Sequence, residues 1–323
     1  MNKDQMLLEM IASAVQEMRG NGQWGTAHVY HSAGNAFRRF RQGKDIAFAD
    51  FDASVVKAFE NDLRRRQCSW NTVSTYMKVL RAIYNRAIDQ GLAPYAPRLF
   101  RHVQTAVHTE RKKAMETGEI GTLFHADGRM PDAALQQARD LFRLMFLLRG
   151  MPFVDLAYLR KGDLTGDTIR YRRRKTGRPL TVRLTPEARQ LIGRLANRDS
   201  RSPYLFPFLS SPEGSEAAYR EYQAALRRLN RHLAVLRLRL GCDTALSTYT
   251  ARHTWATMAY YCEVHPGIIS EAMGHSSIAV TETYLKPFRN ERIDAANREV
   301  IAFVQRQGLP DRHAARRAFR RSS

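Results

Sequence analysis

Apolar residues recur every three or four positions through the first hundred residues of the chain, a spacing that predicts amphipathic helices. The clearest case runs over residues 71–90, where the apolar side chains form one continuous face. These side chains are Val73, Tyr76, Met77, Leu80, Ile83, Tyr84, Ala87 and Ile88. Gly91 and Pro94 end the pattern, since neither residue continues a helix well. Earlier helices are expected at residues 5–19, 26–41 and 52–66, which together predict a compact N-terminal bundle of four helices.

The pattern lapses after this bundle and then resumes with a different period. Residues 101–114 are polar and basic and carry no sustained apolar stripe, so we place a linker at residues 106–115. In the second domain, helices are expected at residues 133–148, 152–159, 186–196 and 216–240, and strands at residues 168–171 and 180–184. The strands flank Lys175, Thr176 and Gly177, which predicts a β-hairpin with its turn there. The predicted fold class is mainly α with a small β-hairpin or sheet.

The charge of the chain points to a polyanionic partner. Its 323 residues contain 52 Lys and Arg against 31 Asp and Glu, which gives a net charge of +21. A domain this basic usually faces phosphate. Arginines on several helices of the bundle, Arg38, Arg39 and Arg81 among them, form either a solvated face or a surface laid along a duplex. We expect double-stranded DNA to be the partner.

Other classes of protein fit the sequence poorly. The longest apolar runs fall far short of a membrane span, and the acidic N-terminus has no signal-peptide core. We therefore expect a cytoplasmic, nucleoid-associated protein with no membrane partner. Three cysteines without any C-x-x-C spacing indicate neither a disulfide framework nor a cysteine zinc site.

Four short segments carry the candidate chemistry. In chain order they are LLRGMPFVDL at residues 147–156, RRRKTGRP at 172–179, ARHTWAT at 251–257 and GHSSIAVTETYL at 274–285. The last segment alone would fit a helix-turn-helix packed in a core, because a short motif is weak evidence without its context. The order and spacing of all four segments, however, resemble the tyrosine recombinase (phage integrase) family, and in particular a variant subgroup of mobile-element integrases and invertases.

The resemblance gives the central role to Tyr284. A phenol with a pKa near 10 is a poor nucleophile at neutral pH, so it needs neighbours that hold the phosphate and share the proton. The resemblance supplies Arg252 as a phosphate ligand, His275 as a ring donor, and Lys175 as the hairpin lysine that protonates the leaving 5′ oxygen. Plainer alternatives are a surface arginine, a histidine that caps or packs, and a lysine that only contacts phosphate. No metal and no cofactor is implied.

Two positions depart from the family pattern, and the first is Pro152. It occupies the place of the family's first arginine and has no group that donates to phosphate. Arg149 lies three residues earlier, and residues three apart share roughly one side of a helix, so we expect Arg149 to bring a guanidinium from the preceding turn. A salt bridge or an exposed surface position is the alternative. Asp155, which matches the acidic residue of this segment, is expected to orient an arginine.

The second departure is Tyr249, which stands at the family's histidine position three residues before Arg252. A phenol donates a hydrogen bond to phosphate but accepts a proton poorly at neutral pH, so we expect Tyr249 to position the phosphate rather than relay protons. An aromatic core residue is the alternative. His253 is expected to support the site behind Arg252, and Arg172 and Arg174 are expected to contact DNA.

The resemblance also implies an architecture. Residues 1–105 are expected to form a helical core-binding (SAM-like) DNA-binding domain, residues 116–310 an α+β catalytic domain, and residues 311–323 a basic tail. The two domains would grip opposite faces of a duplex. Four protomers would join two sites in a synaptic complex, and without DNA the protein would be a monomer or weak dimer. An amphipathic segment at residues 290–307 would dock into a neighbouring protomer or pack on its own domain.

Site-specific recombination is the function that follows, by integration, excision or inversion through a 3′-phosphotyrosyl intermediate. Two alternatives stay open. A DNA-binding protein that kept the fold and lost cutting is favoured by Pro152 and Tyr249. A type IB topoisomerase shares the chemistry but acts as a monomer, whereas the amphipathic segment after Tyr284 indicates an oligomer.

Overall fold

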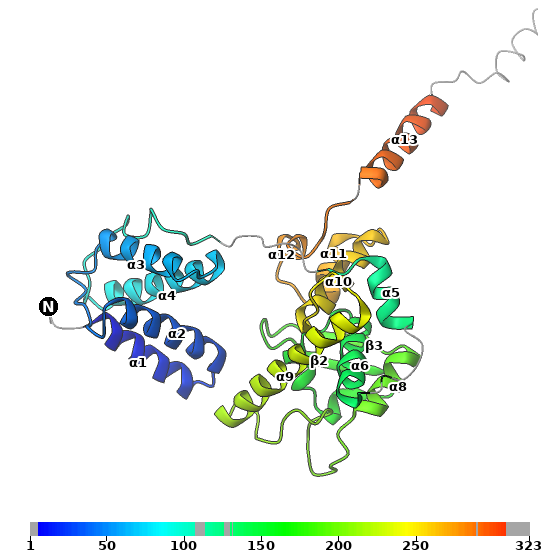
Figure 1. The fold of residues 1–323 in the computed structure, drawn as a ribbon, viewed down its shortest axis with the longest axis horizontal. Helices are drawn as coiled ribbons and strands as arrows, with labels where there is room; N and C mark the ends of the chain where they lie inside the picture. The colour runs from blue at the N-terminus through cyan, green and yellow to red at the C-terminus, as the bar shows by residue number, and fades with distance from the viewer. Residues whose placement is uncertain (1–5, 107–113, 126–129, 131, 289, 308–323) are drawn as a thin grey trace, which may run out of the picture.

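A computed structural model describes residues 6–106, 114–125, 130, 132–288 and 290–307. These residues form two helical domains, followed by one further helix (Figure 1). Most of the predicted linker at residues 106–115, and the whole predicted tail at residues 311–323, lie outside the described residues. No helix in the described ranges is both long and apolar enough to cross a membrane.

The N-terminal domain is the predicted bundle of four helices. They are α1 (Leu7–Gly20), α2 (Trp24–Phe40), α3 (Ala53–Arg65) and α4 (Trp70–Asp89). The side chains of Asp52 and Ser69 cap α3 and α4, each accepting from the backbone N–H three residues along, at 2.9 and 3.2 Å. The apolar faces meet in one core, where the buried rings of Phe37 and Phe59 pack edge to face with centroids 5.1 Å apart.

The C-terminal domain is built around α6. Its helices are α5 (Thr117–His125), α6 (Ala133–Leu147), α7 (Phe153–Ala157), α8 (Pro186–Leu195), α9 (Glu216–Leu240), α10 (Thr248–Tyr261), α11 (Pro266–Met273) and α12 (Ile278–Glu282), with a short 3-10 helix η1 (Lys161–Asp163). α6 packs against α8, α9 and α10, so the helix that carries the ARHTWAT segment rests on the domain core. This contact fixes α10 relative to the other elements that carry candidate residues.

A small antiparallel sheet lies on this domain, with strand order β1, β2, β3. β2 (Thr168–Arg172) pairs with β3 (Pro179–Arg183) in the register Arg172 to Pro179, as expected for the predicted hairpin. β1 (Leu164–Thr165) was not predicted, because two residues are too few to show an alternating pattern. The prediction of a mainly helical chain with a small sheet is confirmed.

The two domains also meet away from the linker. The indole Nε1 of Trp24, at the start of α2, donates to the carbonyl oxygen of Gly214, just before α9, at 2.7 Å. In Figure 1 the start of α9 accordingly lies beside the N-terminal bundle.

The last helix, α13 (Asn290–Gln307), projects away from both domains (Figure 1). Its large apolar side chains are between 47% and 61% exposed. They are Ile293, Val300, Ile301, Phe303 and Val304. The expectation that this segment packs on its own domain is therefore wrong for the structure, which leaves the apolar face uncovered.

Candidate active site

Tyr284 lies directly after α12 and is 8% exposed. Its ring contacts three side chains that the sequence had singled out. The ring centroids of His253 and His275 lie 4.6 and 4.9 Å away, and the guanidinium carbon of Arg252 lies 5.6 Å from its centroid. Residues up to 35 positions from Tyr284 in sequence, such as Tyr249, thus lie around its phenol.

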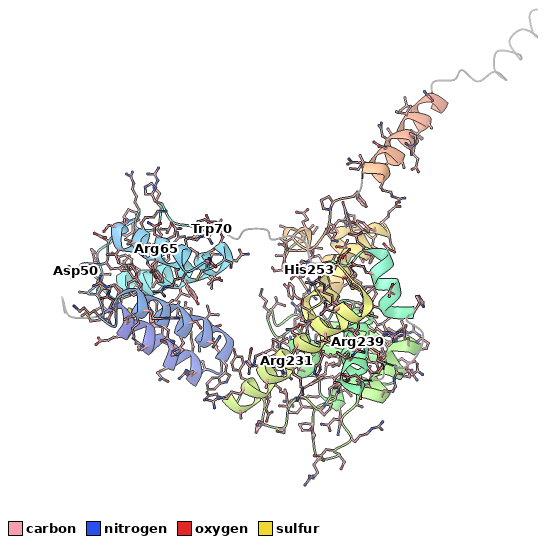
Figure 2. All side chains as sticks on the ribbon, in the orientation of Figure 1. Asp50, Arg65, Trp70, Arg231, Arg239 and His253 are labelled. Atoms are coloured by element: carbon pink, nitrogen blue, oxygen red, sulfur yellow. The ribbon has the colours of Figure 1, made fainter. Side chains whose placement is uncertain are left out.

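α10 supplies one wall of this site. Ser247 caps the helix in a capping box with Thr250, which fixes where the helix begins. Positions three and four apart share a helix face, so Tyr249, Arg252 and His253 point to the same side. His253, labelled on α10 in Figure 2, lies between the two tyrosines, 5.1 Å from the ring of Tyr249. The support expected of His253 is therefore a ring contact with the phenol itself.

Tyr249 shares a short hydrogen bond between its hydroxyl and that of Tyr284. The pKa of Tyr249 is raised, first by burial around its hydroxyl and then by this hydrogen bond. The ring is nevertheless 47% exposed, so Tyr249 is not an aromatic core residue, and that alternative is wrong. At neutral pH its hydroxyl keeps its proton.

Arg252 is 2% exposed, so it is not a surface arginine. Its Nη1 donates to the carbonyl oxygen of Gly150, and its Nη2 to that of Met273, both at 2.8 Å. Gly150 has φ +67°, and a Cβ there would lie 3.0 Å from the Cα of Arg252, so a side chain would push the two segments apart. Burial, together with the charge of Arg173, lowers the pKa of Arg252.

His275 follows Gly274, the left-handed residue that ends α11, as the sequence indicated. Its Nε2 lies 2.7 Å from Nη2 of Arg252 and its Nδ1 lies 2.8 Å from Oγ1 of Thr281. An arginine only donates, so Nε2 must accept and the proton of the neutral ring belongs on Nδ1. Burial, and then the charges of Arg252 and Arg173, lower the pKa of His275 to about 3. In this state Nε2 of His275 is an acceptor, and the expected donor role requires Arg252 to turn away and the ring proton to lie on Nε2.

Lys175 lies at the turn between β2 and β3 and is exposed. The hairpin is anchored beside His275, because Arg178 Nη1 donates to the carbonyl oxygen of His275 at 2.8 Å and Thr176 Oγ1 to that of Gly274 at 3.5 Å. Lys175 is close enough for its charge to help lower the pKa of His275. The ammonium is thus tethered near Tyr284 on a flexible stem.

Arg149 does not share a helix with Pro152. α6 ends at Leu147, and Arg149 follows with φ +60°, while Pro152 begins α7 as its N-cap. The expectation that Arg149 and Pro152 occupy successive turns of one helix is therefore wrong, because the chain reverses between them. The guanidinium of Arg149 donates to the carbonyl oxygen of Thr181 in β3 at 3.2 Å.

Asp155 orients an arginine, but that arginine is Arg173, which the sequence analysis passed over. Asp155 Oδ2 accepts from Nη1 of Arg173 at 2.9 Å, and Oδ1 accepts from the backbone N–H of Arg174 at 3.0 Å. Both side chains are buried, and burial raises the pKa of Asp155 against the opposing charge of Arg173. Three consecutive arginines look alike in sequence, and only the contact with Asp155 distinguishes the middle one.

The arginines expected to contact DNA are placed unequally. Arg38, Arg39 and Arg172 are exposed. Arg81 is half-buried, with its guanidinium carbon 5.3 Å from the ring centroid of Phe100. Arg174 forms an ion pair with Glu213 and stacks over Tyr158 at 3.7 Å, so an internal carboxylate already offsets its charge.

Comparison with known proteins agrees with this geometry. Residues 6–102 match the model of the phage integrase SAM-like domain, and residues 113–291 match that of the phage integrase family. No protein among the curated sequences matches the chain. A buried tyrosine in such a cluster, on this two-domain fold, characterises the tyrosine recombinases, and the resemblance to that class is confirmed. The chain belongs to the phage integrase family.

Solved structures share the fold at low sequence identity. The integrase of the transposon Tn1549, bound to transposon right-end DNA, is 16% identical with a TM-score of 0.65, over 92% of this chain and 100% of that chain. A lambda integrase dimer bound to a COC′ core site is 14% identical with a TM-score of 0.62, over 87% and 95%. A lambda integrase tetramer bound to a Holliday junction is 14% identical with a TM-score of 0.62, over 88% and 78%.

Proposed function

We propose that the protein is a site-specific DNA recombinase that cuts and rejoins strands through a covalent bond between Tyr284 and the 3′ phosphate. One observation carries this proposal: the phenol of Tyr284 is held against Arg252, His275 and Tyr249 within a single chain. A tyrosine that only packs in a core does not require a buried arginine and two histidines around its ring. A nucleophile that attacks a phosphodiester does, because charge develops on the nonbridging oxygens.

The cutting step can be assigned to particular groups. The oxygen of Tyr284 attacks phosphorus, the bond from phosphorus to the 5′ oxygen breaks, and Lys175 gives its proton to that oxygen. Arg252 holds the nonbridging oxygens, and His275 joins it once Arg252 has turned from Nε2 and the ring proton lies on Nε2, with Thr281 then donating to Nδ1. Tyr249 holds the hydroxyl of Tyr284 by a hydrogen bond and does not take up its proton, which is released to water at the exposed side of Tyr249. Rejoining is the reverse reaction, and it needs no nucleotide because the phosphotyrosyl bond keeps the energy of the broken one.

Double-stranded DNA is the proposed substrate, bound by both domains. The net charge of +21 and the exposed Arg38, Arg39 and Arg172 supply contacts to phosphate on each domain. The Tn1549 and lambda integrases of similar fold were solved on DNA. We further propose action on a mobile element, in the cytoplasm at the nucleoid.

Assembly into a tetramer on two sites is proposed from α13. The helix leaves its own domain and exposes an apolar face, which a second protomer can cover. One lambda integrase structure is a tetramer on a Holliday junction. A lone apolar helix in water is costly, so assembly on DNA is expected to order and bury it.

The test is detection of a covalent adduct on denaturing gels. The full chain is incubated with nicked duplexes built from inverted repeats near its coding locus, and Tyr284→Phe is the matched control because it removes a single oxygen. An adduct that the control lacks supports the proposal, and strand exchange between two labelled duplexes separates a recombinase from a topoisomerase. Tight sequence-specific binding without adduct on any nicked duplex would instead establish the silent DNA-binding protein that Pro152 suggests.

A further inference from the structure

We propose that Arg173 is a catalytic residue that binds the scissile phosphate, supplying the guanidinium that Pro152 cannot. The inference rests on the proposed function and assigns to it a residue outside the family motif. Arg173 lies directly after β2, two residues before Lys175. One short segment would then provide both a ligand for the phosphate and the acid for the leaving group.

The burial of Arg173 is the first argument. It is 6% exposed, whereas Arg172 and Arg174 on either side are exposed. An ionised side chain is expensive to bury and is usually found inside only with a paired charge or a function. Asp155 provides the paired charge, at 2.9 Å from Nη1. That contact engages Nη1 and leaves Nε without a hydrogen-bond partner among the described residues.

The direction of the side chain is the second argument. The stem of Arg173 crosses Gly274, whose missing Cβ would lie 2.9 Å from its Cγ and 3.4 Å from its Cδ. Gly274 immediately precedes His275, so the stem passes over the residue next to the ring that stacks on Tyr284. The backbone of Arg173 is also fixed, because its N–H donates to the Arg178 carbonyl at 2.9 Å and its carbonyl accepts from Gly177 at 2.7 Å.

Unsatisfied donors are the third argument. The Nε atoms of Arg173 and Arg252 are both buried, and neither has a hydrogen-bond partner in the described part of the chain. Buried donors are rarely left unpaired without a reason. The two guanidiniums also interact electrostatically, since the charge of Arg173 lowers the pKa of Arg252. Asp155 pairs with Arg173 and interacts with Arg252 through charge, so one carboxylate is set against two cations, and an anion such as a phosphodiester would neutralise the remaining positive charge.

Arg149 is the competing candidate, and its geometry is less favourable. It is committed to the carbonyl oxygen of Thr181, on the strand that follows the hairpin turn. Its backbone is in the left-handed region, so it does not extend the helix toward Pro152. Arg173 instead pairs with Asp155, three residues after Pro152 and on the helix that Pro152 begins.

The experiment measures the rate of adduct formation on nicked duplexes for wild type, Arg173→Ala, Arg149→Ala and Arg170→Ala. Arg170 is the matched control, since it is an exposed arginine on β2, the strand that leads to Arg173. Removing one preorganised donor to a developing oxyanion typically slows a reaction by about 10²–10³ fold, so we expect Arg173→Ala to be slowed about 100-fold or more and Arg170→Ala by less than about threefold. DNA binding, measured separately, should change little.

A second substrate distinguishes a role of Arg173 in binding the phosphate from a purely structural role. In a methylphosphonate at the cut position a methyl group replaces one nonbridging oxygen, so the charge that Arg173 would neutralise is absent. On the methylphosphonate, we expect the rate of adduct formation by Arg173→Ala to approach the wild-type rate. On the ordinary phosphodiester, Arg173→Lys, which keeps a cation to pair with Asp155, should react at a rate between those of Arg173→Ala and wild type. Equal slowing on both substrates would mean a structural role and overturn the proposal.

The outcomes distinguish this proposal from the function on which it rests. If wild type forms no adduct, the recombinase proposal fails and this inference with it. If wild type forms the adduct and Arg173→Ala matches it, or if Arg149→Ala shows the charge-dependent loss instead, only the assignment of Arg173 is wrong.

Discussion

At the residue scale, the hydroxyl of Tyr284 meets the hydroxyl of Tyr249 where other members of the family have an imidazole. The raised pKa of Tyr249 and the lowered pKa of His275 keep both groups uncharged near neutral pH. Arg252, Arg173 and Lys175 are the cations whose charges act on His275 beside the phenol. Proton transfer in this site depends on hydrogen bonds between neutral groups and on the lysine.

The pKa of His275 predicts how stability depends on pH. Its value of about 3 in the folded protein lies below the ordinary value near 6.5, so between these values only the unfolded chain takes up the proton. The contribution of His275 to the free energy of unfolding is complete above pH 6.5 and is lost as pH falls. From pH 7 to pH 5 the loss is about 2 kcal/mol.

The substitution His275→Gln removes this titration and keeps a side chain that forms hydrogen bonds. Denaturant unfolding at pH 7 and pH 5 should therefore show a smaller decrease for the variant than for wild type. The same decrease in both proteins would mean that His275 does not hold its neutral form in the folded state.

Gly274 offers a second prediction. Gly274→Ala should slow adduct formation at least tenfold, because the new Cβ would displace the stem of Arg173. Gly241→Ala is the control, since Gly241 ends α9 with nearly the same φ and has open space around it. Both variants should lose about 1 kcal/mol of stability from the positive φ. Similar rates for the two variants would show that the contact with Arg173 is unimportant for cutting.

At the element scale, α10 carries three of the side chains around Tyr284, so its first turn matters to the chemistry. Ser247→Ala removes the cap of this helix and should reduce the free energy of unfolding by about 1 kcal/mol, together with the rate of adduct formation. Ser215→Ala, which uncaps α9, should cost similar stability with a smaller effect on the rate. Urea unfolding and gel rates on the same preparations compare the two helices.

The elements show what the sequence could predict. Periodicity was sufficient for α4 and α9, because long stripes are dominated by burial of one face. Motif spacing brought Tyr284, Arg252 and His275 together correctly as candidates. The predicted end of the helix at residue 148 agrees with α6, which ends at Leu147, but the argument from helical spacing still treated Arg149 and Pro152 as positions on one helix. The burial of Arg173 was also beyond reach, because it depends on a carboxylate 18 residues away.

At the scale of the whole molecule, we expect α13 to govern assembly rather than cutting. Deleting residues 290–323 should leave Tyr284 and its contacts in place, since the site is complete without α13. We expect this deletion to retain adduct formation on a single nicked site and to lose higher-order complexes in sedimentation experiments with DNA. Val300→Asp with Val304→Asp, which places charge on the exposed face, should act in the same direction.

A matched control is available on the opposite side of this helix. Replacing Arg298 by Asp changes the charge of α13 by as much as the two aspartates together and leaves its apolar face intact. Complexes that survive the Val300 and Val304 changes would mean that another surface holds the protomers together. Loss with Arg298→Asp as well would point to charge rather than apolar burial.

Arg252 has a consequence for how this family changes over generations. Its guanidinium joins the carbonyls of Gly150 and Met273, so its loss would strand buried acceptors and weaken the domain as well as the chemistry. The hydroxyl of Tyr284 forms a hydrogen bond with the exposed hydroxyl-bearing residue Tyr249, and Phe would fill the same space. A lineage that gave up cutting and kept DNA binding should therefore lose the tyrosine early and retain the arginine long afterwards, as a structural relic of an abandoned reaction.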